Sequence, residues 1–222
     1  MILGLDYSAG RPGGKAIKDA GYQFVVRYLS DGGPGLPGKL LTPQEADDLL
    51  SNSVAIAVVW ETVAQRILGG QDAGAADARA AVAQIARCGG PDDRPVYFAA
   101  DWDATPQQQD PIDDYLRGAA DVIGVERVGV YGGYWPLSRA KTEETERWFW
   151  QTGAWSGGLQ APNPNAPGDW PHRPQPVPFL DTQVYQRPGQ YVTVGGVSCD
   201  VNEARVDDYG QWPAPPDPGQ LA

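Results

Sequence analysis

Two carboxylates at the end of an apolar run are the residues of this sequence best placed to do chemistry. The segment Val96 to Asp103 reads Val-Tyr-Phe-Ala-Ala-Asp-Trp-Asp, so that a single residue separates Asp101 from Asp103. Alternate residues of a β-strand point to the same face, and we therefore expect both carboxylates on one side of a strand. Acids at the carboxyl end of a buried strand are typical of α/β barrel hydrolases, in which paired carboxylates cleave glycosidic bonds.

Further acids stand at the ends of other predicted strands. Asp6 ends the first strand, Glu61 follows the third and Asp200 lies at the last. Because the active groups of an α/β barrel gather where its strands end, we expect these acids to share one mouth with Asp101 and Asp103. Acids that face one another repel, which raises the pKa of some of them, as a glycosidase general acid requires.

Polar and aromatic residues near the same strand ends are expected to contact a ligand. Tyr131 ends the fifth strand, Gln183 belongs to the seventh and Trp102 lies between the two carboxylates. Aromatic rings at these ends are suited to pack on the apolar faces of sugars. The alternatives are that the rings pack in the core or in loops, and that each acid caps the helix after its strand.

Apolar runs alternate with helix-like stretches through most of the chain, as expected for βαβ units. The predicted strands cover residues 2–6, 23–29, 54–60, 96–101, 127–131, 147–152, 179–185 and 196–201. Helices are predicted over residues 12–20, from residue 43 onward, and over 72–87, 111–123, 135–144 and 202–209. Thr42, Pro43 and Glu45 form a capping-box pattern at the second helix.

This order of elements favours an α/β fold, a (β/α)8 TIM-like barrel with an irregular, helix-poor last third. The alternative is a doubly wound sheet, which usually carries a Gly-rich phosphate turn that this sequence lacks. Residues 157–178 are rich in proline and are expected to form a long irregular loop. We assign residues 1–210 to the barrel and the Pro-rich residues 211–222 to a disordered tail or linker.

The composition excludes several classes of function. The 222 residues carry a formal net charge of −11 and no run of Lys and Arg, so nucleic acid is not an expected partner. Cys88, Cys199 and the single His172 form no pattern for a metal site or a histidine-based triad. We therefore expect no cofactor, and the alternative of a carboxylate-bound cation lacks an EF-hand loop to support it.

The sequence also gives an expectation about location. No apolar stretch is long enough for a membrane-spanning helix. The opening residues, Met-Ile-Leu-Gly-Leu-Asp, lack the positive and apolar regions of a signal peptide. These observations predict a chain made in the cytoplasm without a signal, which would reach a cell wall after lysis or as part of a virion.

At the motifs described above, the chain resembles the glycoside-hydrolase-like barrels of domain-of-unknown-function family 1906, relatives of the glycoside hydrolase family 25 lysozymes. The resemblance extends from residue 4 to about residue 209. The segments that carry it are Gly4-Leu5-Asp6-Tyr7-Ser8, Phe24-Val25-Val26-Arg27-Tyr28, Ala99-Ala100-Asp101-Trp102-Asp103, Gly129-Val130-Tyr131-Gly132, Gln183-Val184-Tyr185 and Cys199-Asp200-Val201-Asn202.

The resemblance implies a retaining glycoside hydrolase that acts on bacterial cell-wall polysaccharide, with peptidoglycan as the expected substrate. A phage-encoded lysin or a virion-associated module is the setting that would suit such a chain. In the lysozyme relatives the strand-four motif is Asp-x-Glu, so that Asp101 matches the assisting acid and Asp103 replaces the proton-donating Glu. Asp6 and Asp200 match the flanking acids of the subsite.

This chain departs from the lysozyme motif at the proton donor. Asp103 is one methylene shorter than Glu, roughly 1.5 Å in reach, so Glu61 on a neighbouring strand is the alternative donor. The alternative function is a non-catalytic carbohydrate-binding or virion structural module on the same barrel. The oligomeric state is left open by the sequence.

Overall fold

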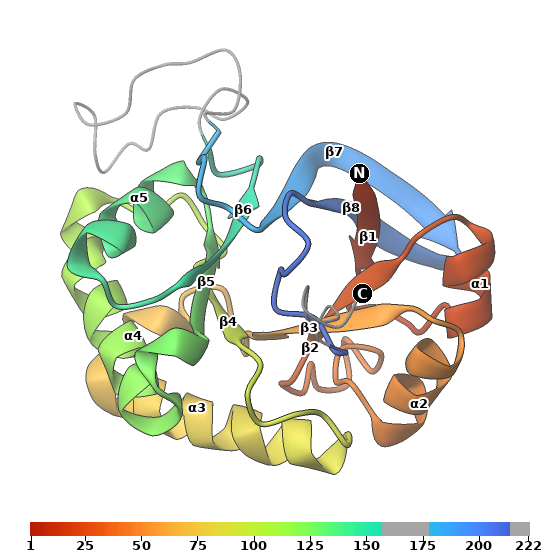
Figure 1. Cartoon of the computed structure of the whole chain (residues 1–222). Coiled ribbons are helices and arrows are strands. Elements are labelled where there is room, and N and C mark those ends of the chain that lie inside the picture. Colours follow the sequence, from red (N-terminus) through yellow and green to blue (C-terminus); the bar gives the residue numbers. More distant parts are fainter. Residues whose placement is uncertain (157–177, 214–222) are drawn as a thin grey trace, which may run out of the picture.

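The computed structural model of the chain describes residues 1–156 and 178–213. Within these residues, eight strands close into a barrel in sequence order (Figure 1). They are β1 (Ile2–Asp6), β2 (Phe24–Tyr28), β3 (Ala55–Trp60), β4 (Val96–Ala99), β5 (Val128–Gly132), β6 (Trp148–Thr152), β7 (Val184–Val194) and β8 (Val197–Ala204). Strands β1 to β7 run parallel to their neighbours, whereas β8 is antiparallel to both β7 and β1. The predicted TIM-like barrel is confirmed.

Helices cover the outside of the barrel along the first two thirds of the chain. They are α1 (Gly14–Asp19), α2 (Pro43–Ser51), α3 (Gly70–Arg87), α4 (Gln109–Ile123) and α5 (Tyr134–Glu143), with short 3-10 helices η1 (Arg66–Gly69), η2 (Pro106–Gln108) and η3 (Val125–Arg127). Figure 1 shows β7 and β8 on the side that these helices leave open. The irregular last third is thus confirmed. None of the helices in the described part of the chain combines the length and apolar character that a bilayer crossing requires.

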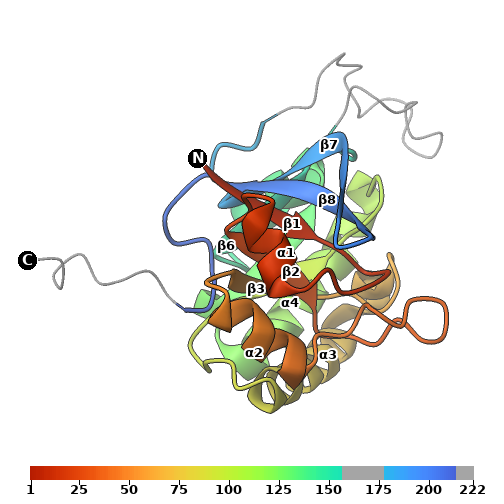
Figure 2. The ribbon, with the colours of Figure 1, turned by 90° about the vertical axis from the view of Figure 1, so that its right-hand side faces the viewer.

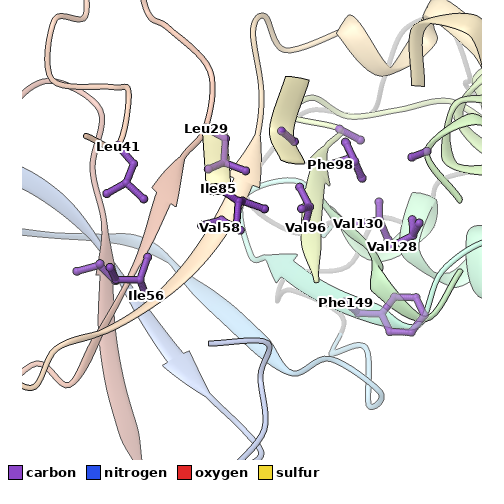
Figure 3. Close-up of a cluster of buried hydrophobic side chains, with 14 of the residues drawn as sticks. Leu29, Leu41, Ile56, Val58, Ile85, Val96, Phe98, Val128, Val130 and Phe149 are labelled. Atoms are coloured by element: carbon purple, nitrogen blue, oxygen red, sulfur yellow. The ribbon is translucent and has the colours of Figure 1, made fainter. Parts of the chain in front are cut away.

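Side chains alternate between the inner and outer faces of the strands, and this alternation produces two separate apolar clusters. Inward-facing side chains, among them Val26 and Ala57, fill the barrel interior. Outward-facing side chains such as Val58 and Val96 pack beneath the helices, in a cluster that includes Ile85 of α3 (Figure 3). Because both faces of these strands are buried, their sequences are continuous apolar runs.

The predicted start of the second helix is found at Thr42. The Thr42 hydroxyl accepts a hydrogen bond from the Glu45 N–H at 3.2 Å, and Pro43 opens α2. The Glu45 carboxylate, however, bonds to Arg27 of β2 at 2.9 Å and does not complete a capping box. The start of α2 is therefore attached to the barrel by an ion pair.

The bounds of the last two strands differ from the prediction. β7 runs from Val184 to Val194 and not over residues 179–185, and β8 extends to Ala204 where a closing helix over residues 202–209 was expected. Gly195 and Gly196, with φ of 54° and 79°, form the turn that joins the two strands into a hairpin. A hairpin reverses the chain, and this reversal makes β8 antiparallel to β1.

After β8 the chain crosses the amino end of the barrel. Tyr209 packs on Phe24 with ring centroids 4.6 Å apart, and its carbonyl accepts a hydrogen bond from the Tyr97 hydroxyl at 2.8 Å. Trp212 is buried and exchanges two backbone hydrogen bonds with Ile56. Gln211 and Trp212 are therefore packed on the barrel and do not form part of a tail. The predicted tail from residue 214 onward, and the predicted loop up to residue 177, lie outside the described residues.

Two glycines allow α3 and α4 to cross closely. A Cβ on Gly74 of α3 would lie 1.9 Å from the carbonyl oxygen of Tyr115, and a Cβ on Gly118 of α4 would lie 1.9 Å from that of Gln71. Each helix therefore presents bare backbone to the other, and neither position has room for a side chain.

We expect Gly118→Ala to destabilise the protein, although alanine is ordinarily the better helix former. The added methyl group forces the two helices apart at a cost of about 1–3 kcal/mol, which exceeds the gain of up to about 1 kcal/mol in helix propensity. Urea unfolding followed by circular dichroism measures the change. A variant at least as stable as the wild type would contradict the close crossing.

Candidate active site

Most of the predicted site residues meet at the carboxyl ends of the strands, which we call the mouth. Asp6, the last residue of β1, lies opposite Asp200 in the register of β1 and β8. Directly opposite residues of antiparallel strands point to the same face, so these two carboxylates share one side of the sheet. Tyr131 of β5 and Asp101, which follows β4, are joined to this group by hydrogen bonds.

Asp6 is buried deep in the mouth, with an exposed fraction of 2%. Its Oδ2 accepts hydrogen bonds from Gln186 Nε2 at 2.8 Å and from Asn202 Nδ2 at 2.7 Å. Burial, and next the negative charge of Asp200, raise the pKa of Asp6 to about 7, against the opposing effect of the two amide donors. Asp6 therefore exchanges its proton near neutral pH.

A tryptophan inside the barrel fixes the orientation of Asn202. Trp150 Nε1 donates a hydrogen bond to Asn202 Oδ1 at 2.9 Å. Because an indole N–H can only donate, the carbonyl side of the amide faces Trp150 and the NH2 side faces Asp6. Both Trp150 and Asn202 are buried, so solvent does not compete for these bonds.

Tyr131 and Gln186 connect Asp6 to Asp101. The Tyr131 hydroxyl lies 2.9 Å from Gln186 Oε1 and 3.3 Å from Asp101 Oδ1. Trp155 Nε1 donates to the same oxygen of Asp101 at 2.8 Å. Among the described residues, both donors to the Asp101 carboxylate bond to Oδ1 and none bonds to Oδ2.

Asp101 and Asp103 lie in a loop, because β4 ends at Ala99 and not at residue 101. The prediction that they occupy one face of a strand is therefore wrong. Burial raises the pKa of the half-buried Asp103, and burial followed by the charge of Asp101 raises the pKa of Asp200. The mouth thus holds several carboxyl groups that keep their protons to higher pH than usual, as a general acid must.

Glu61 joins the mouth through a buried lysine that we did not predict. Lys39 Nζ lies 3.1 Å from Glu61 Oε2 and 4.8 Å from the centroid of the Tyr28 ring. Burial raises the pKa of Glu61, the ammonium group of Lys39 lowers it, and the charge of Asp101 raises it. Lys39 belongs to a Gly/Pro-rich loop, in which no periodic pattern indicates the direction of a side chain.

A buried arginine holds the loops behind the mouth. The guanidinium group of Arg27 bonds to both oxygens of Glu45 at 2.9 and 3.2 Å. It also donates to the backbone carbonyls of Tyr7, Gly38 and Lys39. The Tyr7 hydroxyl donates to Glu45 at 3.0 Å, and its ring packs on the guanidinium group. This network connects the segments after β1 and β2 to α2, and so holds Lys39 in place.

Two side chains that were predicted to contact a ligand bond to other parts of the protein instead. Gln183 precedes β7, and its Oε1 accepts a hydrogen bond from the Phe149 N–H at 2.6 Å near the amino end of the barrel. The prediction for Gln183 is wrong because β7 begins at residue 184, which brings Gln186 to the mouth instead. Trp102 Nε1 donates to Gln108 Oε1 at 3.0 Å, so that its polar atom serves its own loop.

Besides Lys39, the amides of Gln186 and Asn202 are site residues that sequence reasoning missed. A neutral amide has no chemical signature of its own in a sequence. Strand alternation provides the available signal, because each amide lies two residues after an inward-facing residue, Val184 or Asp200. Within the described part of the chain, no three His, Cys, Asp or Glu residues are grouped to hold a metal ion.

The fold and the acids of the mouth define a glycoside hydrolase-like barrel. A family model described as Rv2525c-like, glycoside hydrolase-like domain matches residues 15–204. The chain belongs to this family. The resemblance to glycoside-hydrolase-like barrels is thereby confirmed, and the likeness to family 25 lysozymes is confirmed for the fold.

The relatives span nearly the whole chain. Rv2525c of Mycobacterium tuberculosis, provisionally named a peptidoglycan hydrolase, is 32% identical over 216 residues, which cover 94% of this chain and 82% of the relative. The crystal structure of Rv2525c with L-tartrate has a TM-score of 0.79 and 30% identity, covering 95% of this chain and 98% of that one. The glycosyl hydrolase 25 GHIP of Streptococcus pneumoniae shares the fold alone, with a TM-score of 0.54, 11% identity and coverage of 91% and 86%.

The expectation of a cytoplasmic chain without an export signal is wrong. The relative Rv2525c is a Tat-secreted protein, so export through a signal occurs in this family. The opening residues misled because Ile2–Asp6 form β1 of the barrel. Their composition reflects strand packing and carries no information about export.

We expect Asp6→Asn to change how stability depends on pH. A carboxyl group whose pKa is raised from 3.8 to about 7 stabilises the folded state at low pH and loses that contribution as pH rises through about 7. Asparagine keeps an acceptor oxygen and cannot ionise. As pH rises from about 4 to about 8, the free energy of unfolding of the variant should therefore increase by about 2–4 kcal/mol relative to that of the wild type.

Urea unfolding of both proteins across this pH range provides the measurement. The buried Glu146, whose pKa burial raises to about 7, produces a similar trend in both proteins. The difference between the two curves therefore isolates Asp6. A difference that stays constant with pH would show that Asp6 ionises like an ordinary carboxyl group.

Proposed function

We propose that this protein is a hydrolase that acts on the glycan of bacterial peptidoglycan. The naming of the relative Rv2525c and the glycoside hydrolase-like family support this substrate class. The observation that carries the proposal is the convergence of Tyr131 and Trp155 on one oxygen of Asp101, in a mouth that also holds Asp6 and Asp200. Carboxyl groups in different protonation states are what cleavage of a glycosidic bond requires.

Asp101 is the assisting carboxylate in this proposal. Tyr131 and Trp155 hold its Oδ1, so that the orientation of the carboxylate is set before a substrate binds. A preorganised negative charge stabilises the positive charge that develops on the sugar ring in the transition state.

Asp103 is the proton donor in this proposal. Burial raises its pKa, and its half-buried side chain remains accessible to a leaving oxygen. Glu61 is the alternative donor, and a proton on Glu61 would break its ion pair with Lys39 at 3.1 Å. Asp103 is chosen because it stands at the position of the proton-donating Glu in the strand-four motif.

Release of reducing ends from purified cell wall tests the activity. The wild type should release them, and Asp101→Asn and Asp103→Asn should each lower the rate by about 10²–10⁴-fold, because each removes an ionisable group from the reaction. Asp47→Asn makes the same change at an exposed position of α2 and should keep the wild-type rate. Equal rates for the wild type and both mouth variants would overturn the assignment.

A non-catalytic carbohydrate-binding module is the second candidate function. It is favoured by the place of Asp103 in a loop beyond β4, where an aspartate reaches less far than the glutamate of the lysozyme motif. In that case the wild type, Asp101→Asn and Asp103→Asn would all sediment with purified wall and none would release reducing ends. The phage or virion setting stays a prediction.

A further inference from the structure

The β7–β8 hairpin continues past the end of the barrel wall. The last pair between β6 and β7 is Thr152 with Gln186, yet β7 runs on to Val194 before it turns into β8. Residues 192–199 therefore form a two-stranded ribbon beyond the barrel, and Tyr191 and Asp200 pair at its base. In Figure 2 the tip of this ribbon projects to the same side as the loops after β1 and β2, which is the side of the mouth.

A bulge in β7 decides which side chains of the ribbon face the mouth. Gln186 lies opposite Asn202 and Tyr191 opposite Asp200, so the longer stretch of β7 matches a shorter stretch of β8. In a regular strand, Gln186 and Tyr191 would point to opposite faces, because an odd number of steps separates them. The bulge, which contains Pro188, brings Tyr191 onto the face of Gln186.

The two faces of the ribbon have different surroundings. Val194 and Cys199 point outward and are buried in the outer apolar core. Tyr191 and Thr193 lie on the opposite face, and Thr193 pairs directly with Ser198. This second face is exposed to solvent and continues the inner face of the barrel.

Tyr191 is an exposed aromatic ring beside the acids of the mouth. It is 69% exposed, so its ring contributes little to the packing of the barrel. Its cross-strand partner Asp200 lies close enough to Asp6 and Asp101 for their charges to interact. A flat ring at this position can cover the apolar face of a sugar, and the adjoining hydroxyl groups can bond to its rim.

We propose that the ribbon face of Tyr191, Thr193, Ser198 and Asp200 is a sugar-binding subsite, in which Tyr191 stacks on a ring of the glycan strand next to the bond at Asp101. The inference rests on the proposed function and adds the direction in which the glycan strand runs across the protein. The glycan leaves the mouth along β7 and β8, the side that the helices leave open. Continuity of this face with the acid mouth is what identifies a glycan strand as its occupant.

Calorimetric titration with linear, peptide-free peptidoglycan glycan strands tests the subsite. All proteins carry Asp103→Asn so that the strands stay intact. Adding Tyr191→Ala should weaken binding on the order of tenfold, because the stacked ring is lost. Tyr191→Phe keeps the ring and should bind as the parent does.

Leu180→Ala is the matched control, because it also removes an exposed apolar side chain, 88% exposed, from the segment before β7. It should leave binding unchanged, and all variants should unfold at the temperature of the parent. Equal binding by the parent and Tyr191→Ala, or equally weak binding by Tyr191→Phe and Tyr191→Ala, would overturn the stacking subsite while the proposed function stands. A parent that does not bind strands, together with a wild type that releases no reducing ends, would overturn the proposed function and the subsite together.

Discussion

The reversed direction of β8 is the constraint on which the site depends. In a barrel of parallel strands, each strand contributes its last residues to the mouth, whereas β8 enters at the mouth and contributes its first residues there. For this reason one strand presents both Asp200, a like charge, and Asn202, an amide donor, to Asp6. The proton affinity of Asp6 follows from this balance, and the hairpin that reverses the chain also builds the ribbon at the rim.

Buried side chains with a fixed hydrogen-bonding character set the orientation of more adaptable ones. Trp150 can only donate, and it therefore decides which side of the Asn202 amide faces the mouth. Arg27 likewise can only donate, and it forms hydrogen bonds to Glu45 and to the backbone of the loop that carries Lys39. Since these bonds lie in the core, the arrangement of the acids is determined by packing within the barrel, and a satisfied network of this kind is rigid.

The sequence was sufficient for the barrel because strands buried on both faces leave continuous apolar runs, as in Ala55–Trp60. It was insufficient for the end of β4, since Ala100 continues the apolar run beyond the last ladder pair at Ala99. In a sequence, Pro188 and Gly189 suggest that a strand ends, but a bulge accommodates both residues within β7. The acids of the mouth were predictable because carboxylates at strand ends are conspicuous. The roles of Gln186, Asn202 and Lys39 depend on partners that only the closed fold brings together.

The bond between Asn202 and Asp6 joins the last strand of the barrel to the first, across 196 positions of sequence. Contacts so remote along the chain are slow to form in refolding, and during synthesis they must wait until the final strand has emerged. Before that moment Asp6 has neither the amide of Asn202 nor the neighbouring charge of Asp200, both of which come from β8. The surroundings that set the proton affinity of Asp6 are therefore completed by ring closure itself.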